Sequence, residues 1–455
     1  MGGGAWLAQF IKSDLLHHFI RIEIALGVIG GLSAVMLYAA YAWTDYYYPA
    51  MLIVIALISL LVGMEIPLLT RVIEQDKGIR QSLSEVLATD YVGALLASLL
   101  FPFILLPYLG HLLTAFAIGS LNLIVALIVV WHFRKRLIKT KQLFVGVAVG
   151  LVLMLVSSVF SNNFAGIFER SLYQDPVIFS QQSKYQKLVI TQQGKDLRLF
   201  LNGNLQFSSL DEYRYHEPLV HLPASHSRVL ERALVIGGGD GLAARELLKY
   251  KSLNEIVLVD LDPEVTALGA TLTQLRALNK QALDDPKVKI QNADAWRWLE
   301  QQGDLFDVII IDLPDPSNVD IARLYTTEFY KKIARRLSVG GIMITQASSP
   351  WVERKAFWSI GATLDSVFST VNAVYSHVPS FGPWGFMMAS NTPLNKQRNI
   401  PNETRYVKDD NWKFLLEHPN DLPPISLPAN QLQTLVLMQY YNDSYDALQK
   451  GLHIQ

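Results

Sequence analysis

Apolar positions are distributed unevenly along the 455-residue chain. Five long apolar runs lie before about residue 161, and shorter apolar stretches separated by polar residues make up the rest. Each run is close to the ~20 apolar residues with which a helix crosses about 30 Å of hydrocarbon. A buried soluble helix explains one such run but not five in succession. Residues 1–165 are therefore predicted to form a multi-span helical membrane domain, with spans near Ile20–Trp43, Ala50–Ile73, Ala88–Leu109, Leu112–Phe133 and Leu143–Phe160.

Basic residues gather in alternate connections between these runs, while residues 44–49 and 109–111 contain no Lys or Arg. Basic loops stay in the cytoplasm as a rule, so the basic connections and the N-terminus, with Lys12 and Arg21, are predicted to be cytoplasmic. Five crossings then leave residue 161 onward outside the cytoplasm. The basic residues of the two connections are Arg71, Lys77 and Arg80, and then Arg134, Lys135, Arg136, Lys139 and Lys141.

Two acids interrupt the apolar runs. Glu65 lies inside the second run and Asp90 opens the third. An ionisable group at membrane depth is costly and is a functional candidate. Hydrogen bonding beside a helix kink at Pro67 is the structural alternative for Glu65.

After about residue 175 the apolar positions alternate with period two. Short strands are predicted over 185–190, 197–201 and 205–207, with turns at Gln193-Gly194 and Asn202-Gly203. Asn-Gly between two strands is the strongest short-range hairpin signal. We therefore expect a small β-meander domain over residues 175–228.

From Arg232 strands alternate with helical stretches. Near-continuous apolar strands of this kind suit a parallel sheet covered by helices on both faces, with ligands at the carboxyl ends of the strands. Residues 229–395 are predicted to form this α/β domain, followed by a C-terminal extension over 396–455. The predicted strands are 233–236, 255–259, 288–291, 306–312 and 341–345.

Composition narrows the chemistry. The formal net charge is −1, so no overall positive field attracts nucleic acid. The chain has no cysteine, which excludes disulfides, cysteine nucleophiles and thiolate metal sites.

The first strand of the α/β domain runs into glycines at 237, 239 and 241, which let the backbone approach a nucleotide closely. A dinucleotide fold expects its third glycine at position 242, where Leu242 stands. The G-x-G-x-G spacing is typical of sulfonium-nucleoside sites, and Asp260 at the end of the next strand can accept both ribose hydroxyls. A glycine turn without a ligand and a nicotinamide enzyme are the alternatives.

Acids follow the next two strands. Asp294, within Asn292-Ala-Asp294-Ala295, can accept a hydrogen bond from the amine of adenine, although an Asp there is often only a helix cap. The fourth strand ends in Asp312-Leu-Pro-Asp315-Pro316. A protonated amine is no nucleophile, so one carboxylate must take its proton while another holds the remaining charge. A solvated acidic turn is the alternative.

Together these segments resemble spermidine synthase over roughly residues 180–390, and the membrane half is similar to the multi-span form of that family. The resemblance implies a class I S-adenosylmethionine-dependent transferase-like (Rossmann-like) domain. The matching motifs are Tyr185-Gln186, Asp211-Glu-Tyr-Arg-Tyr215-His216-Glu217, Gly237-Gly-Gly-Asp-Gly241, Asp260, Asp294-Ala295 and Asp312 to Pro316.

The resemblance implies a role for each matched residue. Asp312 would be the proton acceptor, and Asp240 would hold the aminopropyl amine of decarboxylated S-adenosylmethionine. A carboxylate at 240 also repels the carboxylate of ordinary S-adenosylmethionine. The remaining donor-binding residues would be Gln186, Gly237, Gly239, Gly241, Asp260, Asp294 and Ala295, and the polyamine-binding residues Tyr215, His216 and Asp315.

The chain departs from the family pattern on the acceptor side. Val319 stands where a donor-contacting proline is expected, and Arg323 and Tyr325 belong to the same altered segment. The late P-T-Y motif reads Pro379-Ser-Phe381, which removes a tyrosine hydroxyl, and 382–385 adds bulk beside it. Donor binding is expected to be intact, while the identity of the acceptor stays open.

The sequence thus predicts an aminopropyltransferase that uses decarboxylated S-adenosylmethionine as cosubstrate, without prosthetic group or metal. A diamine such as putrescine would yield spermidine and methylthioadenosine. The alternatives are a membrane polyamine carrier or sensor and a methyltransferase on another substrate. We expect a multi-pass protein of the inner membrane, with the lipid bilayer and a polyamine as partners, and leave a homo-oligomer open. A donor made in the cytosol conflicts with the topology predicted above.

Overall fold

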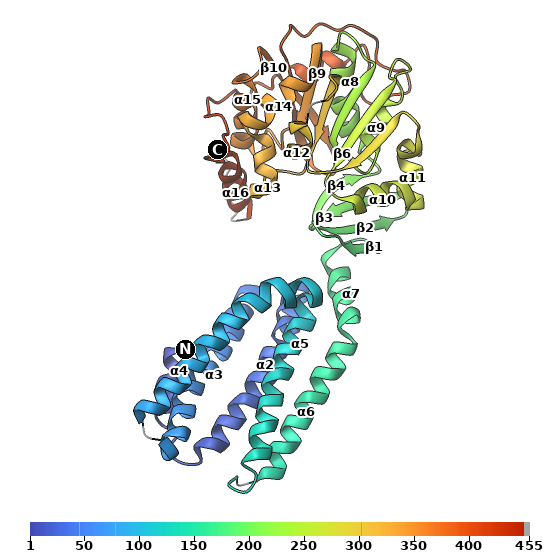
Figure 1. Ribbon diagram of the computed structural model, residues 1–455. Coiled ribbons are helices and arrows are strands. Elements are labelled where there is room, and N and C mark those ends of the chain that lie inside the picture. The colour runs from blue at the N-terminus through green and yellow to red at the C-terminus, as the bar shows by residue number, and fades with distance from the viewer. Residues whose placement is uncertain (45, 78, 138, 302, 450–455) are drawn as a thin grey trace. The chain divides into compact units, whose positions relative to one another are not determined.

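The computed structural model describes residues 1–44, 46–77, 79–137, 139–301 and 303–449. The chain divides into two compact units, Met1–Gln174 and Asp175–Gln455 (Figure 1). The first unit is helical, and the second contains two β-sheets.

Long apolar helices dominate the first unit. Four stretches are long and apolar enough to cross a membrane by length and composition, with Val86–His132 counted as one stretch of 47 residues. The helices of the unit are α1 Gly2–Ala8, α2 Leu15–Trp43, α3 Tyr47–Lys77, α4 Ile79–Leu100, the π-helical turn η1 Phe101–Leu105, α5 Leu106–His132, α6 Thr140–Val159 and α7 Ser161–Leu172.

The 47-residue stretch is interrupted between α4 and α5. Gly110 has φ 68° and ψ −177°, a backbone conformation outside any helix, and η1 lies just before it. In Figure 1 α4 approaches this interruption from one end of the helical unit and α5 returns toward that end. The stretch therefore contains two helices, as the separate runs 88–109 and 112–133 predicted.

Glycines let α2 and α5 pack closely. A Cβ on Gly119 of α5 would lie 2.4 Å from the carbonyl oxygen of Gly27 and 2.7 Å from the Cα of Gly31, both on α2. Small residues at such a contact allow two helix backbones to approach closely. Close packing of this kind is also how helices associate in lipid, where burial of apolar surface gives no driving force.

The two acids noted in the apolar runs lie in different surroundings. Glu65 is partly buried in α3 and its side chain interacts with Glu23 of α2, which is only 8% exposed. Asp90 of α4 is exposed within the helical unit.

The second unit begins with a four-stranded antiparallel sheet in the order β1-β2-β3-β4. Its strands are β1 Val177–Gln182, β2 Lys187–Gln193, β3 Asp196–Leu201 and β4 Asn204–Ser208. The three predicted strands correspond to β2, β3 and β4, and the turns at Gly194 and Gly203 have positive φ as the hairpin signals require. Strand β1 was not predicted.

A seven-stranded sheet follows in the order β10-β11-β9-β8-β5-β6-β7. The five strands from β9 to β7 are parallel, whereas β11 and β10 join antiparallel at one edge. The five predicted strands are β5 Arg232–Gly237, β6 Glu255–Asp260, β7 Val288–Asn292, β8 Phe306–Asp312 and β9 Leu337–Gln346; the sequence reading missed β10 Thr370–Val378 and β11 Gly382–Ser390.

Alternate residues of β5 face two separate hydrophobic clusters. Ala233 and Val235 belong to one, and Leu234 and Ile236 to the other, all almost completely buried. Helices therefore cover both faces of the sheet (Figure 1), which confirms the predicted Rossmann-like α/β domain. These helices include α8 Tyr213–His226 and α9 Leu242–Leu247 on one face, and α12 Ala295–Glu300, α14 Thr327–Arg336, α15 Arg354–Asp365 and α16 Val436–Gln449 on the other.

Further short helices connect these elements. They are α10 Pro263–Thr271, α11 Thr273–Leu278, η2 Ala282–Asp284, α13 Val319–Ala322, η3 Arg323–Tyr325 and η4 Trp412–Leu416.

Candidate active site

The predicted site residues gather at the carboxyl ends of the parallel strands. Gly237 ends β5, Asp260 ends β6, and Asp312 ends β8. Strand β5 has β6 on one side and β8 on the other, so the chain order reverses beside β5. In open α/β sheets a ligand binds at such a switch point. The residues predicted to bind the nucleoside, Asp260 and Asp294, thus follow β6 and β7, and the acids Asp312 and Asp315 follow β8. We call the first group the nucleoside side and the second, with the end of β9, the acidic side.

Two glycines allow the β5 turn to touch the carboxylate-bearing strands on both sides. A Cβ on Gly237, where φ is +80°, would lie 2.0 Å from the backbone oxygen of Asp312. A Cβ on Gly239 would lie 2.6 Å from Oδ2 of Asp260, which accepts a hydrogen bond from the Gly239 amide at 3.0 Å. Side chains at these positions are sterically excluded, and Leu242, in place of a third dinucleotide-type glycine, is fully buried.

Asp260 is held by backbone donors on both carboxylate oxygens. Besides the Gly239 amide, the amide of Asp262 donates to Oδ1 at 2.8 Å. Burial raises the pKa of Asp260 to about 6, although these two hydrogen bonds act in the opposite direction.

Gln186 reaches the same loop from the small sheet. Its Nε2 donates to Oδ2 of Asp262 at 3.1 Å, and the hydroxyl of Ser183 donates to the same oxygen at 2.6 Å. These bonds join residues 183–186 to Asp262, 76 to 79 residues further along the chain and close to Asp260. The resemblance predicts that Gln186 and Asp260 both bind the donor.

Asp294 follows β7 and has two partners. Its Oδ1 accepts from the amide of Trp296 at 2.9 Å and caps α12, while its Oδ2 forms an ion pair with Arg323 at 2.8 Å. The cap was the structural alternative considered for this residue. The ion pair was not expected, and it joins the altered segment after Asp315 to the start of α12, whose first residue, Ala295, is buried.

The acidic side is built around Asp312 and Asp315. The hydroxyl of Tyr215 donates to Oδ1 of Asp312 at 2.7 Å. Asp315 Oδ1 accepts from the hydroxyl of Ser348 at 2.6 Å and from Nε2 of Gln346 at 3.4 Å. Burial raises the pKa of both carboxyl groups.

A buried cation stands beside these acids. His216 is 2% exposed, and its Nδ1 lies 2.8 Å from Oε2 of Glu212. Burial disfavours the imidazolium, but the bond to Glu212 and the charges of Asp240 and Asp312 outweigh it and raise the pKa of His216 to about 9. In turn, burial raises the pKa of Asp240 to about 6 while the His216 charge lowers it. At neutral pH His216 is therefore protonated, and its positive charge acts on both Asp240 and Asp312.

Arg245 of α9 holds Glu212 in place. Its two terminal nitrogens lie 3.0 and 2.9 Å from the two oxygens of Glu212, a bidentate pair, and its Nε lies 2.9 Å from Oε1 of Glu246. Oε2 of Glu246 then meets Nε2 of His221 at 2.7 Å. The side chains of Arg245, Glu212, Glu246 and His221 are all buried. The network therefore connects the charged residues of α9 to Glu212, which contacts His216 at the site.

Aromatic side chains surround Tyr215. The ring centroids of Phe386, Trp384 and Phe381 lie 5.1, 6.2 and 6.4 Å from that of Tyr215. Phe381 is the residue that replaces the family tyrosine, and it brings an apolar ring beside the acidic side rather than a hydroxyl.

Sequence reasoning missed several residues of this site. Ser348 and Gln346 follow or end β9, so the rule that ligands bind at the carboxyl ends of strands could have indicated them. Glu353 is a further acid on the acidic side: burial, followed by the charge of Asp315, raises its pKa to about 7. The pairs Arg245–Glu212 and Arg323–Asp294 join residues 33 and 29 positions apart, for which the sequence gives no local signal. Within the described residues, no group of three or more His, Asp or Glu side chains could hold a metal ion.

The fold is a Rossmann-like α/β domain whose glycine-containing turn after β5 adjoins a half-buried cluster of acids. Residues 212–399 match the family described as the spermine/spermidine synthase domain. Proteins named polyamine aminopropyltransferase match 98% of this chain at 38–40% identity, so the chain belongs to the polyamine aminopropyltransferase family, and it is an aminopropyltransferase.

Relatives named polyamine aminopropyltransferase match nearly the whole chain. The protein of Leptospira interrogans is 38% identical over 98% of this chain and 90% of its own length. Those of Oceanobacillus iheyensis and Mycobacterium tuberculosis are 39% and 40% identical over 98% of this chain and 89% and 88% of their own lengths. A crystal structure of spermidine synthase in complex with the transition-state analogue AdoDATO is 26% identical, with a TM-score of 0.50, and covers 54% of this chain and 86% of that one.

Arg245→Met is expected to lower the stability of the second unit by roughly 3–5 kcal/mol, because it removes the buried cation that Glu212 and Glu246 share and leaves each with one cationic partner, His216 and Lys249. Arg276→Met removes the half-exposed pair with Asp284 and is expected to cost only about 0–1 kcal/mol. Thermal unfolding of the full-length variants in detergent compares the two. Equal shifts would show that the Arg245 network does not stabilise the fold.

Proposed function

We propose that the protein transfers the aminopropyl group of decarboxylated S-adenosylmethionine to a diamine such as putrescine, giving spermidine and methylthioadenosine. The acceptor nitrogen forms a bond to the methylene carbon next to the sulfonium. The carbon–sulfur bond breaks and its electron pair returns to sulfur. The observation that carries this proposal is the nucleoside-type edge at Asp260 beside the half-buried acids Asp240, Asp312 and Asp315.

The donor spans the switch point in this proposal. Asp260 accepts the ribose hydroxyls, and Asp294 with Ala295 meets the adenine, next to Gln186. Asp240 holds the terminal ammonium of the donor. Orientation of the two reactants and matched charge supply the catalysis, since no other chemical group is needed for a direct displacement at carbon.

The acceptor lies on the side of β8 and β9. Asp312 takes the proton from the attacking amine, and Asp315 pairs with the charge that the acceptor retains. The raised pKa of Asp312 suits a base that operates near neutral pH. Tyr215 orients this carboxylate through its hydroxyl, and His216 keeps enough positive charge nearby for Asp312 to ionise.

Asp312→Asn is expected to lower kcat by about 100-fold or more, because the variant loses its general base. Asp315→Asn is expected to act mainly on KM for the acceptor, because it loses a binding charge. Steady-state assays of methylthioadenosine release with putrescine separate the two effects. Wild-type kcat in Asp312→Asn would remove this residue from the mechanism.

The role of Asp240 predicts a pH-dependent choice of donor. With its pKa at about 6, Asp240 binds a proton below that pH, so affinity for decarboxylated S-adenosylmethionine is expected to rise as pH increases through about 6. Asp260 titrates in the same range, and methylthioadenosine, which lacks the ammonium, reports that contribution separately.

Calorimetry at several pH values gives the difference between the two ligands. Asp240→Asn is expected to weaken decarboxylated donor about tenfold or more, the effect of one lost charge-assisted hydrogen bond, and to leave methylthioadenosine nearly unchanged. Asp410→Asn, at an exposed carboxylate, is the matched control. Equal wild-type affinity for decarboxylated and ordinary S-adenosylmethionine would instead favour a methyltransferase.

The helical unit is an integral part of the inner membrane in this proposal. Its apolar helices leave large hydrophobic side chains exposed all along their length, and only 11–33% of each candidate span is buried. Contiguous apolar surface of this extent suits lipid rather than water. At about 1.5 Å per residue, the 20 residues of α6 cover about 30 Å, the thickness of the hydrocarbon layer.

Counting α4 and α5 as two crossings gives five spans from α2 to α6. The basic connections then lie at one end of the helical unit, in the cytoplasm, and the catalytic unit follows on the other side. A reporter that fluoresces only in the cytoplasm, fused after Gln455, is expected to stay dark, whereas a fusion at Lys135 is expected to be bright. Bright fluorescence from the membrane-inserted Gln455 fusion would contradict this topology.

A further inference from the structure

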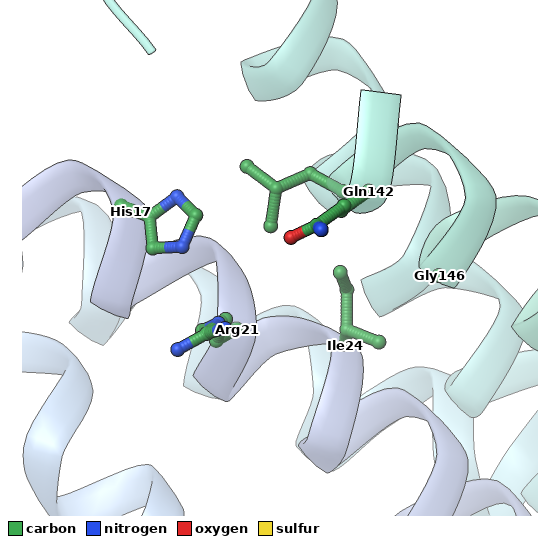
Figure 2. A pocket seen from close by; sticks show the side chains of 6 residues that line it. His17, Arg21, Ile24, Gln142 and Gly146 are labelled. Atoms are coloured by element: carbon green, nitrogen blue, oxygen red, sulfur yellow. The ribbon is translucent and has the colours of Figure 1, made fainter. Parts of the chain in front are cut away.

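A cavity opens between α2 and α6 in the helical unit. It has a volume of about 190 Å³ and is open to the solvent. Figure 2 shows the His17 ring, the Arg21 side chain and the Gln142 amide around this opening. Ile24, Leu143 and Gly146 complete its lining. The polar side chains thus lie toward the starts of both helices and the apolar ones deeper along them.

The polar lining of the cavity is cationic and has hydrogen-bonding capacity left over. Within the described residues, Nδ1 of His17 is buried and has no hydrogen-bond partner. A buried ring nitrogen without a partner is unfavourable, and native structures usually satisfy such groups with protein, water or ligand. Neighbouring His18 differs, because its Nδ1 lies 3.1 Å from the carbonyl oxygen of Asp14.

The charges around His17 come from both helices and the loop before α6. Arg21 and Lys139 act on it as cations, and Asp14 is the acid among these charged neighbours. Arg134, Lys135, Arg136 and Lys141 add exposed positive charge in and beside the same loop. The balance strongly favours an anion.

The N-terminal ends of α2 and α6 add partial positive charge from the helix dipoles. Helix α2 has 29 residues and α6 has 20, and both begin beside the cavity. Neither Asp14 nor Lys139, their respective N-caps, makes a side-chain hydrogen bond to the first turn. Free backbone N–H groups and the helix dipoles therefore stabilise negative charge here.

We propose that this cavity binds a phosphate group, carried by an anionic phospholipid headgroup or free in solution. Arg21 would pair with the phosphate oxygens, because its guanidinium matches their geometry, and His17 would donate from its unpartnered nitrogen. The site lies at the end of the helical unit where the apolar lining of α2 and α6 begins. It is independent of the aminopropyl transfer proposed above.

The test uses the full chain in detergent, with native mass spectrometry to count bound dioleoylphosphatidylglycerol against dioleoylphosphatidylcholine. Wild type is expected to retain phosphatidylglycerol preferentially. Arg21→Gln is expected to weaken that binding about tenfold or more, the effect of one lost charge-assisted hydrogen bond. His17→Asn is expected to weaken it less. Lys135→Gln removes the same charge from an exposed position outside the lining and is expected to bind like wild type.

Inorganic phosphate identifies the source of the group. If it displaces the lipid from wild type, the cavity recognises the phosphate alone; if the lipid stays bound to wild type but is lost from Arg21→Gln, the cavity requires the lipid-borne form. Equal retention of phosphatidylglycerol by wild type, Arg21→Gln and His17→Asn, all with unchanged helical circular dichroism, would overturn the proposal.

Discussion

The catalytic unit depends on the balance between carboxylates crowded at one sheet edge and the cations buried beside them. Asp240 and Asp312 come from neighbouring strand ends, and burial alone raises the pKa of both. His216 offsets this because its own charge is stabilised by Glu212, which Arg245 binds with two nitrogens. The site therefore holds its acids near ionisation before any ligand arrives. A cationic substrate then gains full electrostatic attraction without first reorganising the protein.

The same sheet edge brings the residue predicted to bind the nucleoside, Asp260, close to the residue predicted to act as the base, Asp312. The turn after β5 touches Asp260 on one side and Asp312 on the other, and both contacts need a glycine because a Cβ would overlap the neighbouring oxygen. In the proposed mechanism this turn brings a nucleoside at Asp260 next to the proposed base Asp312. The reacting centre would lie above the turn itself, close to Asp240. Gly237 and Gly239 thus allow the turn to contact the ends of β8 and β6 at the same time.

Much of this arrangement could be predicted from the sequence because the apolar strands are unambiguous and each ends in a chemically distinctive residue. Strand β11 begins with Gly382, Pro383, Trp384 and Gly385, which read as loop until pairing with β9 and β10 supplies the hydrogen bonds of the strand, and β10 was missed with it. Arg245 could not be assigned, because its partner Glu212 lies 33 residues away in the sequence, whereas Ser348 could have been found from its place after β9. In the helical unit hydropathy found each apolar stretch but not the polar continuation of α4 back to Ile79. The roles given to the site residues stay predictions.

The acceptor end of the site differs in character from the donor end, and this difference bears on selectivity. Phe381 and Trp384 provide apolar rings beside Tyr215 where the family pattern offers a hydroxyl. Aromatic walls suit the methylene chain of an amine and attract its ammonium groups only through the ring faces. In this proposal the carboxylates that pair with the nitrogens are Asp312 and Asp315, which are joined by a proline-containing loop. Because Glu353 carries a pKa of about 7 beside Asp315, the number of negative charges at this end changes near neutrality. Acceptors in this proposal are thus distinguished by how many ammonium groups they carry and how far apart these lie, rather than by specific hydrogen bonds.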